Sequence, residues 1–351
     1  MTRAAADVDA LPPPPPESWQ DRATYWRYRG LWAAVARLPA PAAARLPQAL
    51  GAAWHRAAPD HQRERVRAHL QRILRPGDAA PAATTGSQHL DDGRLDAMVR
   101  DAYVQYARYW IDSFRLHRMS PRGIVASTAT ENVELVDAAL AEGGAVLATA
   151  HVGSWDVAAQ WCTLRGWPVT VVAEVVEPRR LFDRFVQLRR DAGLGVIPLV
   201  RGGDMLDRLV EVVDGGGLAT LLADRDLTGK GPVVEFFGEP CRFPPGSAAL
   251  ARRTGRPVAV GAVMTAGRDG YRAVIQGDLL ELSHLSVEDG TQQVAWRMEQ
   301  LLRRYPTQWH VFVRQWLVDR EPDHPAVAAW RADPHGWRSD PTWRAAVAGG
   351  G

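Results

Sequence analysis

The pattern of apolar and polar positions changes character along the chain. Up to about residue 118, apolar and aromatic side chains recur at helical spacing among arginines, which predicts helices over 19–35, 42–74 and 95–116. From Glu142 onward, short apolar runs of strand length alternate with helical segments. This alternation is typical of an α/β sheet with helices on its faces. We therefore expect strands near 144–150, 167–172, 195–199, 217–223, 233–237, 257–265 and 271–275, and helices near 155–164, 181–192, 205–213, 246–253 and 287–304.

The same pattern predicts four regions along the chain. Residues 1–16 contain a proline run and no apolar segment of the signal-peptide kind, so we expect a disordered leader. Residues 17–118 then form an N-terminal helical region, 119–330 the α/β core and 331–351 an irregular tail. No apolar run approaches the roughly 18–20 residues that span a bilayer. Any contact with a membrane is therefore expected to be peripheral.

Composition excludes several classes of protein. The chain is 46% hydrophobic, which is enough for a sizeable core, and its formal net charge of +2 argues against a general nucleic-acid binder. Its two cysteines, Cys162 and Cys241, have no metal-ligand spacing, which favours neither a disulfide scaffold nor a zinc site. Lys230 is the only lysine. The other basic residues are arginines, and an arginine-rich polar face suits an anionic membrane surface.

The first candidate for chemistry is His151, which directly follows the apolar run 144–150. Sites in open α/β sheets lie outside the carboxyl ends of strands. A neutral imidazole there can take a proton from a substrate hydroxyl, while a carboxylate on its other nitrogen holds the tautomer. Asp156 lies five positions later, and we expect it to turn back toward His151 from the first turn of a helix. Ser154 lacks the G-x-S-x-G context of a hydrolase nucleophile.

The spacing of His151 and Asp156 alone also fits a structural histidine or a metal site. A second strand end strengthens the catalytic hypothesis. The apolar run 218–223 ends in Asp224-Arg225-Asp226, and charged groups of this kind are costly to bury unless they are paired or used. Further along, 243–251 reads as a loop that enters a helix, whose N-terminal N–H groups could meet a phosphate or an oxyanion. A hairpin and an ordinary helix cap are the alternative for this segment.

Several segments together resemble a known family. These are Tyr106–Trp110, His151–Asp156, Glu174–Phe185, Arg189 with Gly193, Ala223–Thr228, Phe236–Pro240 and a late Pro-x-x-Trp element at Pro306–Trp309. They resemble the bacterial lipid A biosynthesis (lauroyl/myristoyl) acyltransferase family, within the wider glycerolipid acyltransferase group. The motifs are most similar to those of its actinobacterial phosphatidylinositol mannoside acyltransferases. The resemblance covers about residues 26–316.

The resemblance assigns roles to residues. It implies that His151 is the general base of a His-x-x-x-x-Asp motif, supported by Asp156. Asp224 occupies the position of an acid that pairs with this histidine; glutamate is common there, and the shorter aspartate leaves direct contact open. Glu174 and Arg189 match polar residues near the substrate head groups, with a plain surface ion pair as the alternative. Arg225 and Asp226 complete an acid-Arg-Asp-Leu-Thr element, and the resemblance implies that they belong to the substrate-binding residues and hold the site in shape.

The resemblance also implies an activity and a location. The fold is a glycerolipid-acyltransferase-like central sheet flanked by helices, with N-terminal amphipathic helices that dock on a membrane. The implied reaction transfers a fatty acyl group from acyl-CoA to a mannose hydroxyl of phosphatidylinositol mannoside, and the hydroxyl attacks the thioester directly. No metal, cofactor or nucleic acid is expected to take part. The acyl chain is expected to lie in an apolar tunnel. The expected location is peripheral, at the cytoplasmic face of the cell membrane. Alternatives are an acyl-carrier-protein donor, another glycolipid, lipid A-type or polyketide-type acceptor, and a non-catalytic lipid-binding scaffold.

Overall fold

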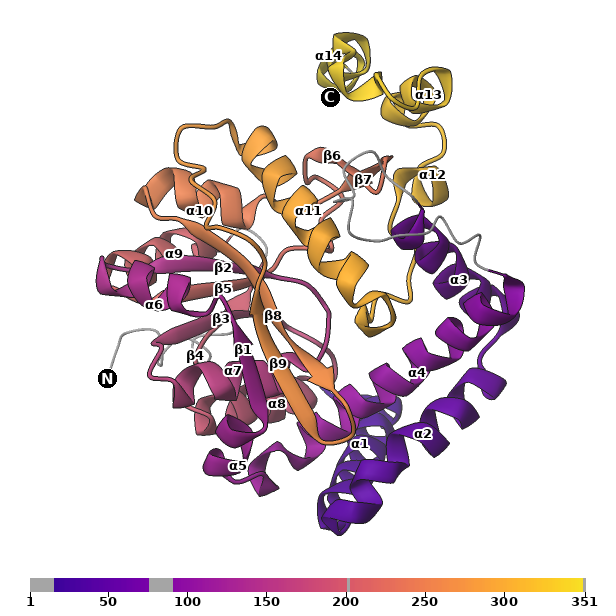
Figure 1. The fold of residues 1–351 in the computed structure, drawn as a ribbon, viewed down its shortest axis with the longest axis vertical. Helices are drawn as coiled ribbons and strands as arrows, with labels where there is room; N and C mark the ends of the chain where they lie inside the picture. The colour runs from indigo at the N-terminus through magenta and orange to yellow at the C-terminus, as the bar shows by residue number, and fades with distance from the viewer. Residues whose placement is uncertain (1–15, 76–90, 201–202, 350–351) are drawn as a thin grey trace.

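A seven-stranded sheet lies at the centre of the computed structural model, which describes residues 16–75, 91–200 and 203–349 (Figure 1). In this described part the strand order is β1-β9-β8-β2-β5-β3-β4. Strands β8, β2, β5, β3 and β4 are parallel, whereas β9 runs antiparallel to β8 and parallel to β1. The strands are β1 (Thr128–Glu131), β2 (Ala145–Thr149), β3 (Val169–Glu174), β4 (Gly195–Leu199), β5 (Leu218–Leu222), β8 (Val258–Ala266) and β9 (Gly270–Ile275).

Helices cover both faces of the sheet, as the alternating pattern predicts. Every residue of β2 is buried, because a central parallel strand has helices above and below it. Val146 and Ala148 face one layer, and Leu147 faces the other. The first layer is α9 (Met205–Asp214), α10 (Gly246–Thr254) and α11 (Val287–Arg304); the second is α5 (Pro121–Ala126), α6 (Glu134–Ala141), α7 (Trp155–Leu164) and α8 (Arg179–Asp191).

The N-terminal region is helical, but its division differs from the prediction. The segment 42–74 forms two helices, because Pro59 disfavours the helical conformation of the residue before it. Residues 76–90 lie outside the described residues, as does nearly all of the predicted leader. Among the described helices, none combines the length and apolar character needed to cross a bilayer. The helices are α1 (Trp19–Arg37), α2 (Ala40–Ala57), α3 (Asp60–Leu74) and α4 (Asp92–Arg115), followed by the short 3-10 helix η2 (Leu116–Arg118).

The tail beyond 331 is not irregular, as the sequence had suggested. Helices α13 (Pro325–Ala332) and α14 (Pro341–Gly349) enclose a small cluster of buried side chains in which Trp337 and Trp343 contact each other. These two indoles supply the apolar area that stabilises the segment. The segment after 232 forms a hairpin of β6 (Val233–Phe236) and β7 (Glu239–Arg242) that leads to α10. Several short elements were not predicted from the sequence, because they are too short to show a clear periodicity. They are α5, β1, α6, β7 and α12 (Leu317–Arg320).

Helices α2 and α4 cross at very close range, and this crossing fixes the N-terminal region. A Cβ atom added at Gly51 of α2 would lie 2.4 Å from the Cα atom of Val104 in α4. That distance is far below van der Waals contact, so only glycine allows the helices to approach this closely.

We therefore expect Gly51→Ala to destabilise the protein by about 1–3 kcal/mol, because overpacking would push α2 away from α4. Gly30→Ala in α1 is the matched control, since a Cβ atom there meets nothing within 4 Å. The control should gain up to about 1 kcal/mol from the higher helix propensity of alanine. Chemical denaturation followed by circular dichroism measures the free energy of unfolding of both variants. Equal stability of the two variants would contradict the close crossing.

Candidate active site

The register of two neighbouring strands brings His151 and Asp224 together. Strands β2 and β5 are adjacent and parallel, with Thr149 opposite Leu222. His151 and Asp224 each lie two residues beyond this pair, so the same register places them side by side at the carboxyl edge of the sheet. The hydrogen bond from the Ala223 amide to the Thr149 carbonyl, at 2.7 Å, continues the ladder toward them. The sequence had placed both residues at strand ends but could not show that the two strands are neighbours.

Asp224 contacts both the ring and the backbone of His151. The His151 Nδ1 atom lies 2.8 Å from Asp224 Oδ1, and the His151 amide donates to Oδ2 at 2.9 Å. The aspartate side chain therefore reaches the histidine directly despite being shorter than glutamate. Burial alone raises the pKa of Asp224, but the contacts with His151 and Trp309 outweigh it and hold the pKa below its usual range. An ionised carboxylate can only accept, so Nδ1 carries the hydrogen and the Nε2 lone pair is free to accept a proton.

A late segment of the chain completes the surroundings of this pair. The Trp309 indole N–H donates to Asp224 Oδ2 at 2.8 Å, and the Gln315 side-chain amide donates to the Asp224 carbonyl. The segment also pairs with the histidine loop, since the His310 amide donates to the His151 carbonyl at 2.7 Å and the Gly153 amide to the Gln308 carbonyl at 3.0 Å. Residues 308–315 therefore act as a brace on both sides of the pair.

His310 of this brace is a second, neutral histidine next to the site. Burial lowers its pKa to about 3, so the ring is uncharged at neutral pH. Its Nε2–H donates to the Gly153 carbonyl at 3.0 Å. Gly153 itself has a φ of 64°, and a Cβ atom there would lie 2.2 Å from the Val263 carbonyl oxygen. Only glycine fits this turn, which directs the chain from β2 past His151 into α7.

Asp156 does not turn back toward His151, contrary to the sequence-based expectation. It begins the first turn of α7 and points toward α4, where its Oδ2 accepts from the Tyr109 hydroxyl at 3.1 Å and from the Ser113 hydroxyl at 2.8 Å. Its Oδ1 lies 3.4 Å from the Arg189 guanidinium. The carboxylate is 2% exposed, and these partners compensate its burial. The orienting acid of His151 is therefore Asp224, and Asp156 ties α7 to α4 and α8.

The other predicted substrate residues occupy different surroundings. Arg189 pairs with the buried Asp156, at 3.4 Å. Glu174 is exposed at the end of β3. Asp226 accepts from the Thr228 amide and hydroxyl and from the Gly231 amide, at 2.7–2.8 Å, which closes the loop after β5. Arg225 is half-buried near Tyr106. Burial raises the pKa of Tyr106, and the charge of Arg225 partly offsets that rise.

Two alternative chemistries find no support in this geometry. Ser154 is fully buried, and its hydroxyl has no partner within the described residues, so it is not placed to attack a substrate. In the described part of the chain, no three His, Cys, Asp or Glu side chains gather in a way that could hold a metal ion. His151 and Asp156, the pair considered for such a site, point to different partners.

An apolar cavity lies between α7 and one face of the sheet. Asp156, Arg189 and Trp155 line its polar end, and the ring centroids of Trp155 and His151 are 5.7 Å apart. Its walls are the side chains of alternate strand positions and the small or aromatic residues of α7, which include Leu147, Val171, Leu222, Val263, Ile275, Ala158, Ala159 and Trp161. An apolar channel of this kind accepts an alkyl chain, because only apolar surface is buried along it.

Comparisons with known proteins agree with this geometry. The model of the family described as bacterial lipid A biosynthesis acyltransferase matches residues 18–318. The chain belongs to this family. It is 35% identical over 315 residues to the phosphatidylinositol mannoside acyltransferase of Mycobacterium tuberculosis (strain CDC 1551 / Oshkosh), which covers 88% of this chain and 93% of that protein. It is 36% identical over 227 residues to the protein of the same name from Mycolicibacterium smegmatis (strain ATCC 700084 / mc(2)155), with 64% and 74% covered.

As a member of this family, the protein is an acyltransferase. Several residues of its site had no assigned role in the sequence. Trp309 ended the late Pro-x-x-Trp element, but its contact with Asp224 spans 85 positions and no local pattern encodes it. Tyr109 and Ser113 had a detectable signal, because residues four apart on a helix share a face and these two polar groups lie in the otherwise apolar stripe of α4.

We expect Trp309→Phe to lower kcat by about 10- to 100-fold with little change in KM, because a hydrogen bond to a charged group contributes about 1.5–3 kcal/mol. Trp309 is a positioning residue that acts through Asp224. The matched control is Trp343→Phe, which removes another buried indole that donates to a backbone carbonyl, that of Trp337 at 2.9 Å, in the C-terminal cluster apart from Asp224. Steady-state acyl transfer measures both variants. If the control loses as much kcat, Trp309 contributes packing only.

Proposed function

We propose that the protein transfers a long-chain fatty acyl group from acyl-CoA to a mannose hydroxyl of a phosphatidylinositol mannoside. The observation that carries the proposal is the His151–Asp224 pair, with Nε2 free to accept a proton beside an apolar cavity. The named activity of the mycobacterial relatives supports the acceptor class. A thioester donor suits the site because a substrate hydroxyl can attack it directly, without an enzyme nucleophile.

In the proposed reaction His151 is the general base. Its Nε2 atom takes the proton of the acceptor hydroxyl while the hydroxyl oxygen attacks the thioester carbonyl carbon. The tetrahedral intermediate collapses as the carbon–sulfur bond breaks, and the imidazolium returns the proton to the departing sulfur. The products are an ester and CoA. Asp224 stabilises the imidazolium during the reaction, because its carboxylate lies 2.8 Å from Nδ1 and is fully buried.

The apolar cavity is the proposed site of the acyl chain. Trp155 lines its polar end, and the ring centroids of Trp155 and His151 are 5.7 Å apart, so a chain inserted between α7 and the sheet would leave its thioester near the base. Glu174, exposed at the end of β3, is proposed to lie nearer the solvent, where a head group would approach. Arg225 and Asp226 are proposed to keep the loop after β5 in place around the substrates.

The N-terminal helices are the proposed contact with the membrane, at the cytoplasmic face. Helix α1 exposes Trp19, Trp26 and Leu31 among arginines, with exposed fractions of 69%, 55% and 49%. Trp and Arg are favoured at the interface between water and lipid, where the indole enters the head-group layer and the guanidinium meets phosphates. A peripheral position would give the enzyme access to a soluble donor and a lipid acceptor at once.

We expect His151→Ala to lower acyl transfer by about 100- to 10,000-fold, the usual contribution of a general base. The measurement is release of CoA from palmitoyl-CoA in the presence of mannosylated phosphatidylinositol, with the product identified by mass spectrometry. Asp224→Asn should also be impaired, because an amide cannot stabilise the imidazolium in the same way. Full transfer by the His151→Ala variant would contradict the assigned base. Transfer only to other glycolipids would contradict the acceptor.

We also expect Ala159→Phe to narrow the cavity and shorten the acyl chains that the enzyme accepts. Ala159 lines the cavity from α7, and a phenyl ring there would occupy the space of several methylene groups. Transfer from palmitoyl-CoA should fall by at least about tenfold relative to transfer from hexanoyl-CoA, since fewer methylene groups could be buried. The short donor serves as the internal control. An equal loss for both donors would place the acyl chain elsewhere.

A further inference from the structure

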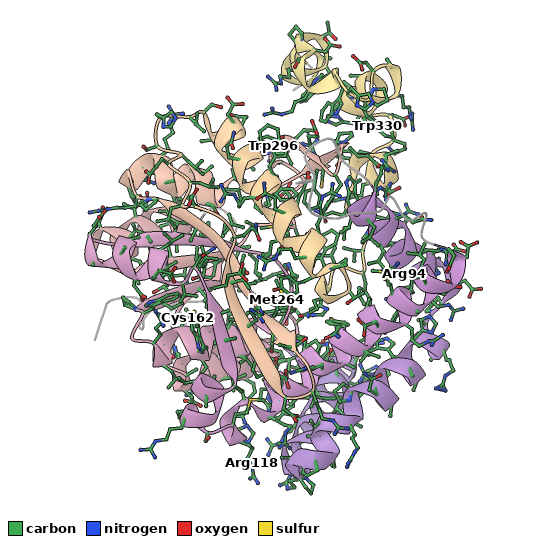
Figure 2. The ribbon with its side chains drawn as sticks, in the orientation of Figure 1. Arg94, Arg118, Cys162, Met264, Trp296 and Trp330 are labelled. Carbon is green, nitrogen blue, oxygen red and sulfur yellow. The ribbon has the colours of Figure 1, made fainter. Side chains whose placement is uncertain are left out.

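A surface hollow between α1, η2 and α8 gathers an unusual concentration of positive charge. Its walls carry Arg29 and Arg37 from α1, Arg118 from η2 and Arg184 from α8, and His117 lies beside Arg118. We call this the α1–α8 hollow. Its floor includes the buried ring of Trp32. Arg118 lies at the lower edge of the view, next to the N-terminal helices (Figure 2).

No carboxylate lines this hollow within the described residues. The nearest acidic side chains along α1 and α8 already have partners. Glu17 pairs with Arg180 and Asp183 with Arg179, while Asp21 closes the capping box at the start of α1 with Ser18. The positive charge of the hollow is therefore not compensated from within the described chain.

Arg37 donates to the Ala33 carbonyl at 2.9 Å, and two other arginines of the hollow are held by stacking on aromatic rings. The guanidinium of Arg184 lies over the ring of Trp32, with 5.2 Å between its central carbon and the ring centroid, and Arg29 lies over Trp26 at 5.1 Å. A guanidinium stacked on an aromatic face keeps its N–H groups free in the plane of the stack. Burial is the main reason for the lowered pKa of His117, and the charges of Arg118 and Arg184 add to it.

Mutually repelling cations that remain together, with free donors and no carboxylate, are typical of a site for a phosphate ester. We propose that the α1–α8 hollow binds the phosphodiester of the anionic acceptor lipid, with Arg118 and Arg184 as its main ligands. This inference rests on the proposed function for the identity of the lipid, since a phosphatidylinositol mannoside carries one phosphodiester between its sugars and its diacylglycerol.

The location of the hollow favours the lipid over the phosphates of CoA. Helix α1, which supplies Arg29 and Arg37, is the same helix that exposes Trp19, Trp26 and Leu31, so the hollow opens beside the proposed membrane contact. A phosphodiester lies at that depth in a bilayer, next to its head group.

The hollow is also connected to the active site. Arg184 and Arg189 lie on α8, and Arg189 pairs with Asp156 at the end of the apolar cavity. Helix α4 donates to the same Asp156 from Ser113 and leads into η2, while Trp32 stacks on Phe114 of α4 with 5.1 Å between the rings. The two helices therefore fix the hollow relative to Asp156 at the polar end of the apolar cavity.

The test compares two double variants of the full-length protein with equal loss of charge. Arg118→Gln/Arg184→Gln removes the proposed ligands. The control Arg252→Gln/Arg331→Gln removes one exposed arginine of α10 and one of α13, neither of which lines the hollow or belongs to the proposed membrane contact. We expect the hollow variant to raise the KM for mannosylated phosphatidylinositol by at least about tenfold, the effect of losing one charge-assisted hydrogen bond, and to leave the KM for palmitoyl-CoA within about twofold.

A second measurement does not depend on catalysis. Flotation with phosphatidylcholine vesicles, with and without phosphatidylinositol, measures binding of the wild-type protein and both variants. The proposal is supported if phosphatidylinositol increases vesicle binding more for the control than for the hollow variant. This result would support it even if mannosylated phosphatidylinositol proves not to be the acceptor. Equal losses in both variants would show general surface attraction and overturn the proposal. A rise in the KM for palmitoyl-CoA alone would overturn it in favour of the CoA phosphates.

Discussion

The burial of the Asp224 carboxylate is the constraint on which the site depends. This side chain is fully inaccessible to solvent, and a buried charge is tolerated only where hydrogen bonds replace the lost water. Two donors come from His151 after β2 and one from Trp309 near the end of the core. The ends of two strands and the late brace of residues 308–315 must therefore be in place together, so the fold and the catalytic geometry are stabilised by the same interaction.

A second buried carboxylate, Asp156, performs a separate task. Its donors are Tyr109 and Ser113 of α4 and Arg189 of α8, so it joins the N-terminal helices to the core. The two acids of the site lie five and 73 positions after His151, and only the more distant one touches it. The separation has a physical basis, because α7 begins at Trp155 and its first turn directs position 156 toward α4 and away from the sheet edge.

The sequence predicts the elements of this site better than their arrangement. The apolar runs before His151 and Asp224 are buried strands. Both residues lie at the carboxyl ends of these strands, where binding sites of parallel sheets are found. That β2 and β5 are neighbours is a property of strand order, which periodicity does not encode. The same holds for Trp309, which reaches Asp224 across a large separation. The helical tail depends on the contact of Trp337 with Trp343, and no repeat marks it in advance.

The contacts of Asp156 with α4 and α8 give the spacing of His151 and Asp156 a different meaning. A carboxylate bound by both α4 and α8 holds together the helix that leads into η2 and the helix that supplies Arg184, and it also lines the polar end of the cavity. Loss of Asp156 would leave Arg189 unpaired at that end and release α7 from α4. Reduced activity in such a variant would therefore reflect displaced substrate sites, with the proposed base His151 and its partner Asp224 still in place.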